Sequence, residues 1–153
     1  MNCNIVFWGR HNEFRSKTDV SDEELVLDIP EIDEQHQTFH EMMSKIGRLV
    51  PDMYKPMDDD QVDDVVDALY DLREFALLHF RTEEDYMSEV DYPELEQQKS
   101  EHERFLTDLT RMEAELMNGS AIPAIKVYNF LNDWYRDHVR NLDKPFGEFY
   151  SKN

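Results

Sequence analysis

Apolar residues recur at spacings of three and four positions in four separate segments of this chain. That period is typical of α-helices that bury one face, and no Val- or Ile-rich alternating stretch favours a strand. Prolines and an Asn-Gly-Ser cluster separate the segments. The pattern predicts helices over residues of about 32–50, 59–87, 93–118 and 122–143.

The connections between the predicted helices are short, which favours antiparallel neighbours. The sequence therefore predicts an all-α fold, an antiparallel up-down-up-down four-helix bundle with an N-terminal arm and a short C-terminal tail. A chain of 153 residues fits one domain with a sizeable core. We expect the arm over about residues 1–30, the bundle over about 31–144 and the tail over about 145–153.

Each predicted helix carries a histidine at a position that the apolar pattern assigns to the core. Carboxylates accompany two of these histidines at spacings of four and five positions. The set consists of His36, His79, Glu83, His102, His138 and Asp143. Buried imidazole and carboxylate groups cost free energy without partners, so their repetition at core positions indicates a bound metal.

Alternating helix directions bring these side chains to one end of the bundle. The first and third helices have their histidines near the start, and the second and fourth have theirs toward the end. Side chains four residues apart stack on one helix face, so His79 and Glu83 can bind the same metal or two adjacent metals. The five-residue spacing of His138 and Asp143 fits one face less well, although a last turn that frays or tightens could swing Asp143 inward.

Imidazole and carboxylate ligands without thiolate suit iron, manganese or zinc. A pair of metals needs bridging carboxylates such as Glu83 and Asp143 to offset the repulsion between the cations. Four imidazoles and two acids meet that need. The sequence lacks the repeated Glu-x-x-His pattern of ferritin-like proteins, so a carboxylate-rich oxidase site is the weaker interpretation.

Four motifs have a joint spacing that is highly specific. They are Ile29-Pro30-Glu31-Ile32-Asp33-Glu34-Gln35-His36, His79-Phe80-Arg81-Thr82-Glu83-Glu84, Tyr92-Pro93 leading to His102, and Trp134 followed by His138 and Asp143. With them the chain resembles the hemerythrin family, and more closely the bacterial hemerythrin-like proteins, over about residues 25–146.

This resemblance implies a non-haem di-iron centre, two Fe ions with a bridging oxo or hydroxo group, that binds dioxygen reversibly as peroxide on one iron. By position, His36 and His79 would hold the oxygen-binding iron, and His102 and His138 the other. Glu83 and Asp143 would bridge the irons. Asp33 and Gln35 would belong to the beginning of the first helix.

Two residues depart from the family pattern. Gln98 stands where the family has a third histidine on the second iron, four residues before His102. Either Gln98 ligates through its amide oxygen, a water takes the place, or that site is partly empty; we expect water or Gln98, with both metals retained. Tyr135 stands where the family commonly has leucine beside the oxygen pocket, and its phenol could hydrogen-bond bound peroxide or admit protons. The resemblance also gives Trp134 a place in that pocket.

A single buried histidine is more often a hydrogen-bonded core residue than a ligand, and only the joint spacing of the four reverses this. His40 lies one turn beyond His36 and could replace the missing imidazole only by reaching across the core. We therefore expect a structural role for His40.

Composition excludes several classes of partner. Sixteen Lys and Arg against thirty-five Asp and Glu give a formal charge of −19, which would repel nucleic acids and anionic membranes. Cys3 is the only cysteine, which rules out an internal disulfide or a zinc finger. With neither a signal peptide nor a transmembrane span in the pattern, we expect a cytoplasmic protein; its protein partners are unknown from sequence.

The leading hypothesis for function is a di-iron oxygen carrier, store or sensor rather than an enzyme. The first alternative is a di-iron peroxidase, oxidase or nitric oxide-consuming enzyme that uses a coordination position opened by Gln98. The second is an iron-dependent regulatory binding protein whose bundle is stabilised by metal.

Overall fold

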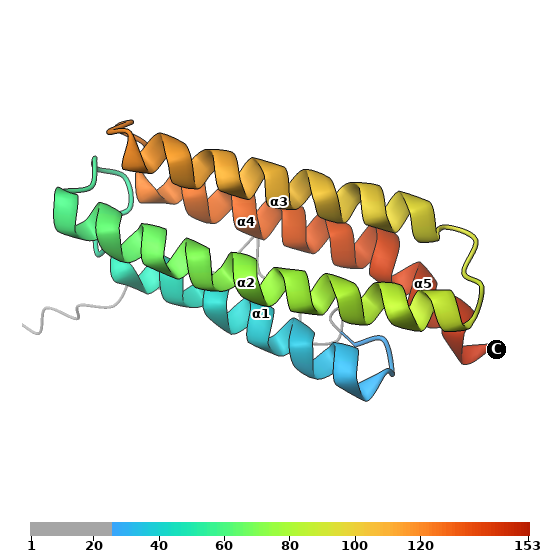
Figure 1. Cartoon of the computed structure of the whole chain (residues 1–153). Coiled ribbons are helices and arrows are strands. Elements are labelled where there is room, and N and C mark those ends of the chain that lie inside the picture. The colour runs from blue at the N-terminus through green and yellow to red at the C-terminus, as the bar shows by residue number, and fades with distance from the viewer. Residues whose placement is uncertain (1–25) are drawn as a thin grey trace, which may run out of the picture.

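Four long helices run lengthwise beside one another and form the predicted bundle (Figure 1). The computed structural model describes residues 26–153, so most of the expected N-terminal arm lies outside the described residues. Within residues 26–153 the elements are all helical, which confirms the all-α prediction. They are α1 (Pro30–Leu49), α2 (Asp59–Glu89), α3 (Leu95–Met117), α4 (Ala124–His138), the π-helical turn η2 (Val139–Asp143) and α5 (Lys144–Ser151).

Local signals explain where the helices begin and end. Pro30 opens α1, where a missing N–H costs nothing. A capping box opens α2: Asp58 Oδ1 accepts from the Gln61 N–H at 2.8 Å, and Gln61 Oε1 accepts from the Asp58 N–H at 3.0 Å. Gly119 follows α3 with a φ of +85°, a left-handed conformation that glycine adopts without strain.

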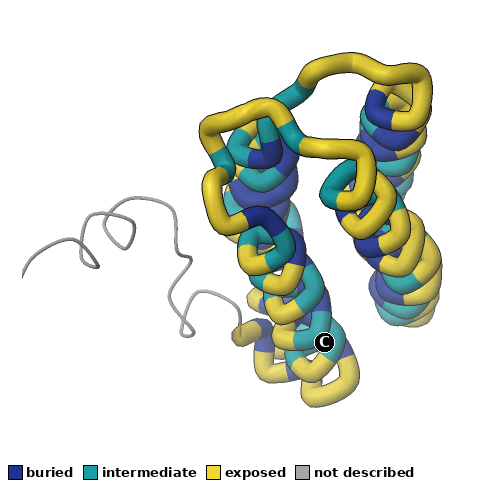
Figure 2. Tube along the Cα trace, turned by 90° about the vertical axis from the view of Figure 1, so that its left-hand side faces the viewer, coloured by how far each residue is buried: buried dark blue, intermediate teal, exposed yellow. Residues whose placement is uncertain are grey.

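Buried residues recur along the helices among exposed ones (Figure 2). The buried apolar residues form two clusters. The larger cluster extends from the middle of the bundle to the end where α1 and α3 finish, and it includes Phe39, Leu72, Phe105 and Leu131. The smaller cluster joins the beginning of α1 to the end of α2 and to α5, and consists of Leu27, Ile29, Ile32, Met87, Tyr92 and Phe146. The sequence-predicted ligands lie between these two clusters on their helices, so a polar layer separates two apolar ones.

The C-terminal region departs from the prediction in two ways. Residues 145–153 were expected to be a tail, but α5 extends to Ser151 and buries Phe146 and Gly147. Pro145 does not end the helix because it lies in the first turn of α5, where proline is tolerated. The sequence left open a last turn that frays or tightens, whereas the turn before α5 widens into the π-helical turn η2.

Candidate metal centre

All six side chains that the sequence singled out meet in the polar layer. They form two groups, and within each group the ligand-type atoms lie within 4.8 Å of one another. The first group is His36, His79, Glu83 and Asp143, and the second is Glu83, His102, His138 and Asp143. Every member is buried, with His138 the most exposed at 5%. The two groups therefore share both carboxylates.

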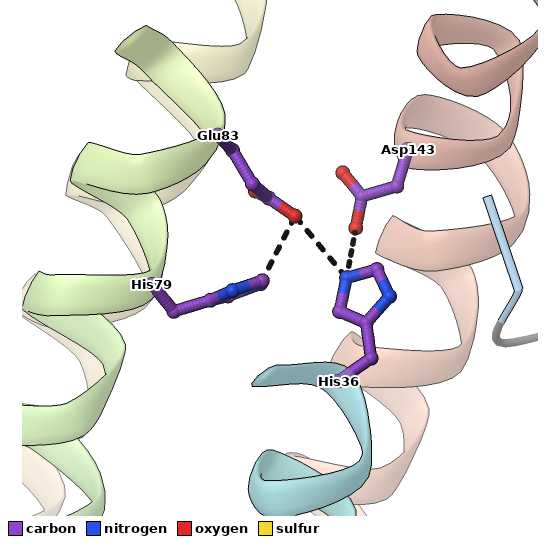
Figure 3. Close-up of side chains that lie close together, drawn as sticks. All are labelled: His36, His79, Glu83 and Asp143. Atoms are coloured by element: carbon purple, nitrogen blue, oxygen red, sulfur yellow. Dashed lines mark hydrogen bonds and ion pairs between the residues drawn. The ribbon is translucent and has the colours of Figure 1, made fainter. Parts of the chain in front are cut away.

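The first group draws on α1, α2 and the end of η2 (Figure 3). Glu83 Oε1 lies 3.1 Å from His36 Nε2 and 3.0 Å from His79 Nε2. Asp143 Oδ2 lies 3.2 Å from His36 Nε2. One oxygen of each carboxylate thus faces this pair of imidazoles.

The remaining oxygens face the second pair. Glu83 Oε2 lies 3.1 Å from His102 Nε2, and Asp143 Oδ1 lies 3.1 Å from His138 Nε2. The two ring nitrogens, His102 Nε2 and His138 Nε2, are themselves 3.1 Å apart. Each carboxylate therefore spans the two groups, which is the arrangement that a bridging ligand requires.

The π-helical turn accounts for the position of Asp143. In an α-helix of 3.6 residues per turn, side chains five positions apart point in different directions. The wider turn of a π-helix pairs residues five apart, and such turns occur frequently at functional sites. With η2 between them, the carboxylate of Asp143 reaches the imidazole of His138 despite their awkward spacing.

A chain of hydrogen bonds fixes the tautomer of His79. The Thr82 hydroxyl donates to the Leu78 carbonyl at 3.0 Å, so its oxygen accepts from Gln35 Nε2 at 3.1 Å. This orientation turns the Gln35 amide oxygen toward His79 Nδ1, 2.9 Å away. Because a carbonyl only accepts, Nδ1 carries the proton and Nε2 faces Glu83, as metal ligation needs.

Glu84 plays the same part for His102. Its Oε1 lies 2.8 Å from His102 Nδ1, and a carboxylate only accepts, so Nδ1 donates. The sequence analysis named Glu84 only as part of a motif, without a role, and assigned Gln35 only to the beginning of the first helix. Their one available signal is that each is polar and adjacent in sequence to a predicted ligand, with Gln35 before His36 and Glu84 after Glu83.

Without metal, protons supply the positive charge that the buried carboxylates need. Burial lowers the pKa of His36, but hydrogen bonds to Asp143 and Glu83 raise it further, to about 10. Burial likewise lowers the pKa of His102, but hydrogen bonds to Glu83 and Glu84 raise it by more, to about 9. Burial raises the pKa of Glu83, but the surrounding histidines lower it by more and hold it well below its usual value.

Asp143 follows the same pattern. Burial and the charge of Glu83 raise the pKa of its carboxyl, whereas His138 and His36 lower it by more. Two buried carboxylates that remain ionised need compensating cations. The buried amide oxygen Gln98 Oε1 accepts no hydrogen bond, and Glu83 Oε2 and Asp143 Oδ2 face only the imidazole nitrogens His102 Nε2 and His36 Nε2. Both observations fit a site built for metal ions.

Aromatic rings stack against the two imidazoles of the second group. Phe80 lies parallel to His102 at 3.9 Å between ring centroids, with an interplanar angle of 4°. Trp134 stacks on His138 at 4.5 Å. The predicted pocket residue Trp134 therefore lies beside the second group, and its role in oxygen binding stays a prediction.

Tyr135 is 2% exposed, and its hydroxyl donates to the backbone carbonyl of His36 at 2.9 Å. Its ring makes an edge contact with the His36 imidazole. Burial raises the pKa of this phenol, and the charges of Asp143 and Glu83 raise it further, so the hydroxyl keeps its proton. In this arrangement the proton is directed to the main chain. Its expected contact with bound oxygen stays a prediction.

Gln98 and His40 have different places. Gln98 is 1% exposed, and its Nε2 donates to Asp143 Oδ1 at 3.3 Å. It therefore contacts a carboxylate of the second group, and its ligation of a metal stays a prediction. His40 belongs to neither group, and its ring centroid is 6.5 Å from that of Tyr135. A structural role for His40 remains our expectation.

None of the helices in the described part of the chain is both long enough and apolar enough to span a membrane.

Comparison with known proteins places the chain in a family. A profile described as "Hemerythrin HHE cation binding domain" matches residues 27–148. Bacteriohemerythrin of Clostridium acetobutylicum is 26% identical over 125 residues, covering 81% of this chain and 95% of that protein. Bacteriohemerythrin of Methylococcus capsulatus is 25% identical over 115 residues, covering 75% and 82%.

Solved structures share the fold. The crystal structure of wild-type hemerythrin superposes with a TM-score of 0.74, at 21% identity, over 87% of this chain and 97% of the other. A hemerythrin mutant gives the same TM-score at 22% identity. The profile match covers most of the chain and includes all six clustered side chains. The chain belongs to the hemerythrin family, as a member with the HHE cation binding domain.

Proposed function

We propose that this protein is a non-haem di-iron protein that binds dioxygen reversibly, as a carrier, store or sensor. The observation that carries the proposal is the pair of groups that share Glu83 and Asp143, with one oxygen of each carboxylate facing each histidine pair. The resemblance to bacteriohemerythrins supports it.

In this proposal His36 and His79 hold one iron and His102 and His138 the other, with Glu83 and Asp143 shared. Two iron ions with a bridging oxo or hydroxo group would supply the two electrons that dioxygen takes up and returns. Imidazole and carboxylate donors without thiolate suit iron in this role. The shared carboxylates offset the mutual repulsion of two cations in a buried layer.

The chain's own residues would keep the reaction reversible. Gln35 and Glu84 hold the Nδ1 protons of His79 and His102, so each Nε2 lone pair is presented without reorganisation. The apolar clusters on either side of the polar layer restrict the access of water along the bundle axis. The Tyr135 hydroxyl keeps its proton and donates it in a hydrogen bond to the His36 carbonyl. No acidic phenol is therefore available to protonate a bound ligand and release it irreversibly.

Binding, rather than turnover, is the function that these features support. We place the protein in the cytoplasm as part of the same proposal, because a chain with one cysteine does not depend on disulfides. Trp134 and Tyr135 would line the ligand pocket, each in contact with one histidine pair.

The test is an absorption spectrum of the anaerobically reduced, iron-loaded protein before and after exposure to oxygen. The proposal predicts a visible charge-transfer band that appears with oxygen and disappears when oxygen is removed, over repeated cycles. Oxidation that cannot be reversed by removing oxygen would contradict it, and consumption of hydrogen peroxide or nitric oxide over many turnovers would favour an enzyme.

A further inference from the structure

A cleft between α3 and α4 reaches one histidine of the second pair, His138. It has a volume of about 440 Å³, and its lining includes Gln97 and Glu101 from α3, Trp134 and His138 from α4, and Asn141 from η2. Neither His36 nor His79 belongs to its lining. The cleft therefore gives a route from solvent to one half of the centre only.

Gln98 does not line the cleft itself, but it contacts the same carboxylate as His138, which does. It is buried, and its Nε2 donates to Asp143 Oδ1, the same oxygen that lies 3.1 Å from His138 Nε2. Its amide oxygen accepts no hydrogen bond. A buried acceptor without a partner costs free energy unless something else satisfies it. The Gln98 amide nitrogen thus supports the shared carboxylate of Asp143, and its amide oxygen can accept a hydrogen bond from a further molecule.

The donor count points the same way. Each group offers two imidazoles and two shared carboxylates, so the second group is no richer in ligands than the first. Iron held by two histidines and carboxylate typically keeps positions open for an external ligand. A metal between His102 and His138 would therefore have room for a molecule that arrives through the cleft.

The charges around the cleft select the kind of molecule. Three carboxylates line it, from Glu101, Asp108 and Asp137, against one cation, Arg104. In a chain with a formal charge of −19, this lining repels anions. A small neutral molecule can pass.

We propose that the Gln98 corner is a second binding position for a small neutral molecule, reached through the α3–α4 cleft, on the metal held by His102 and His138. This inference rests on the proposed two-metal function. Water fills the position at rest, donating a hydrogen bond to Gln98 Oε1, and another small neutral ligand replaces it. The protein thus has two ligand positions in place of one.

Nitric oxide is the probe, because it is small and neutral. The full-length, iron-loaded protein is reduced without oxygen, its iron content is measured, and nitric oxide is titrated with absorption and electron paramagnetic resonance readouts. We expect two irons and two bound nitric oxide molecules per chain. Two irons with one nitric oxide would overturn the second position and leave the proposed function intact, whereas fewer than two irons would overturn both.

Gln98→His adds an imidazole at the corner. This variant is expected to keep two irons and to bind one nitric oxide molecule, a loss of half the stoichiometry. If it still binds two, Gln98 does not define the position and the assignment is wrong. The stoichiometry of the unaltered protein decides the main point even if Gln98→His fails to fold.

The route has its own test. Gln97→Trp narrows the cleft, and Glu96→Trp places the same ring on an exposed neighbouring position outside it. In stopped-flow mixing, the nitric oxide that enters through the cleft should bind in a fast second phase. Gln97→Trp should lose that phase at unchanged stoichiometry, and Glu96→Trp should retain it. Equal rates in the two variants would overturn the route.

Discussion

Loading the cluster with metal at neutral pH should release protons into solvent. His36 and His102 bear protons in the metal-free protein, since hydrogen bonds to carboxylates raise their pKa values to about 10 and about 9. A metal ligand must be a neutral imidazole. We therefore expect each metal to displace one proton.

The cost of this displacement follows from the two pKa values. A pH of 7 is about three units below the His36 pKa of about 10, so removing the proton from His36 costs about 4 kcal/mol. The corresponding cost for His102, two pH units below a pKa of about 9, is about 3 kcal/mol. Apparent affinity for each metal should consequently rise about tenfold for each unit of pH between about pH 6 and 8, where both imidazoles start protonated.

Calorimetric titration of the metal-free protein with ferrous iron, without oxygen and in buffers of different ionisation enthalpy, counts the protons. About two protons should be released for two metals. His40→Gln is the matched control, because His40 lies outside both groups, and it should leave the count unchanged. A count near zero, or an affinity independent of pH, would refute the assignment of protons to the cluster.

Three further outcomes are expected. The metal-free protein should lose stability as pH rises through about 9 to 10. The raised pKa values of His36 and His102 contribute stability that is complete below about pH 6.5 and is lost as those protons leave. Thermal melts should show this loss for the metal-free protein and not for the iron-loaded protein. Glu84→Gln should weaken metal binding by about 10–100-fold in competition with a chelator, because the carboxylate that orients His102 is gone, while Asp85→Asn on the exposed face should have no effect. Gly147→Ala should lower the free energy of unfolding by about 1–3 kcal/mol in urea titrations, since an added Cβ would lie 3.0 Å from Leu27 Cγ and 3.1 Å from the Leu27 carbonyl oxygen; an unchanged midpoint would mean that this contact is loose.

The bundle and the meeting of six side chains could be predicted from sequence because both depend on periodicity. Apolar positions at helical spacing determine which face is buried, and short connections determine the helix directions. His36 and His102 then share a level with His79 and His138 by geometry alone. The structure shows that level as the polar layer between the two apolar clusters.

The position of Asp143 could not be predicted with the same certainty. A π-helical turn has no local sequence signature, and here it is supported by packing elsewhere: Phe146 is buried beyond it and Asp143 itself lies in the cluster.

The orienting hydrogen bonds were also beyond sequence reasoning. Gln35 pairs with His79 from another helix, and Tyr135 donates to a main-chain carbonyl at His36. Such contacts depend on the rotation of neighbouring helices about their axes, which a hydrophobic period determines only coarsely. The orientation of Gln98 toward Asp143 is a further example.

The most direct test of a two-metal centre is a crystal structure of the iron-loaded protein with anomalous scattering measured at the iron edge. Two peaks are predicted, one between the Nε2 atoms of His36 and His79 and one between those of His102 and His138, each in contact with an oxygen of Glu83 and of Asp143. A single peak, or peaks that do not touch both carboxylates, would contradict the account.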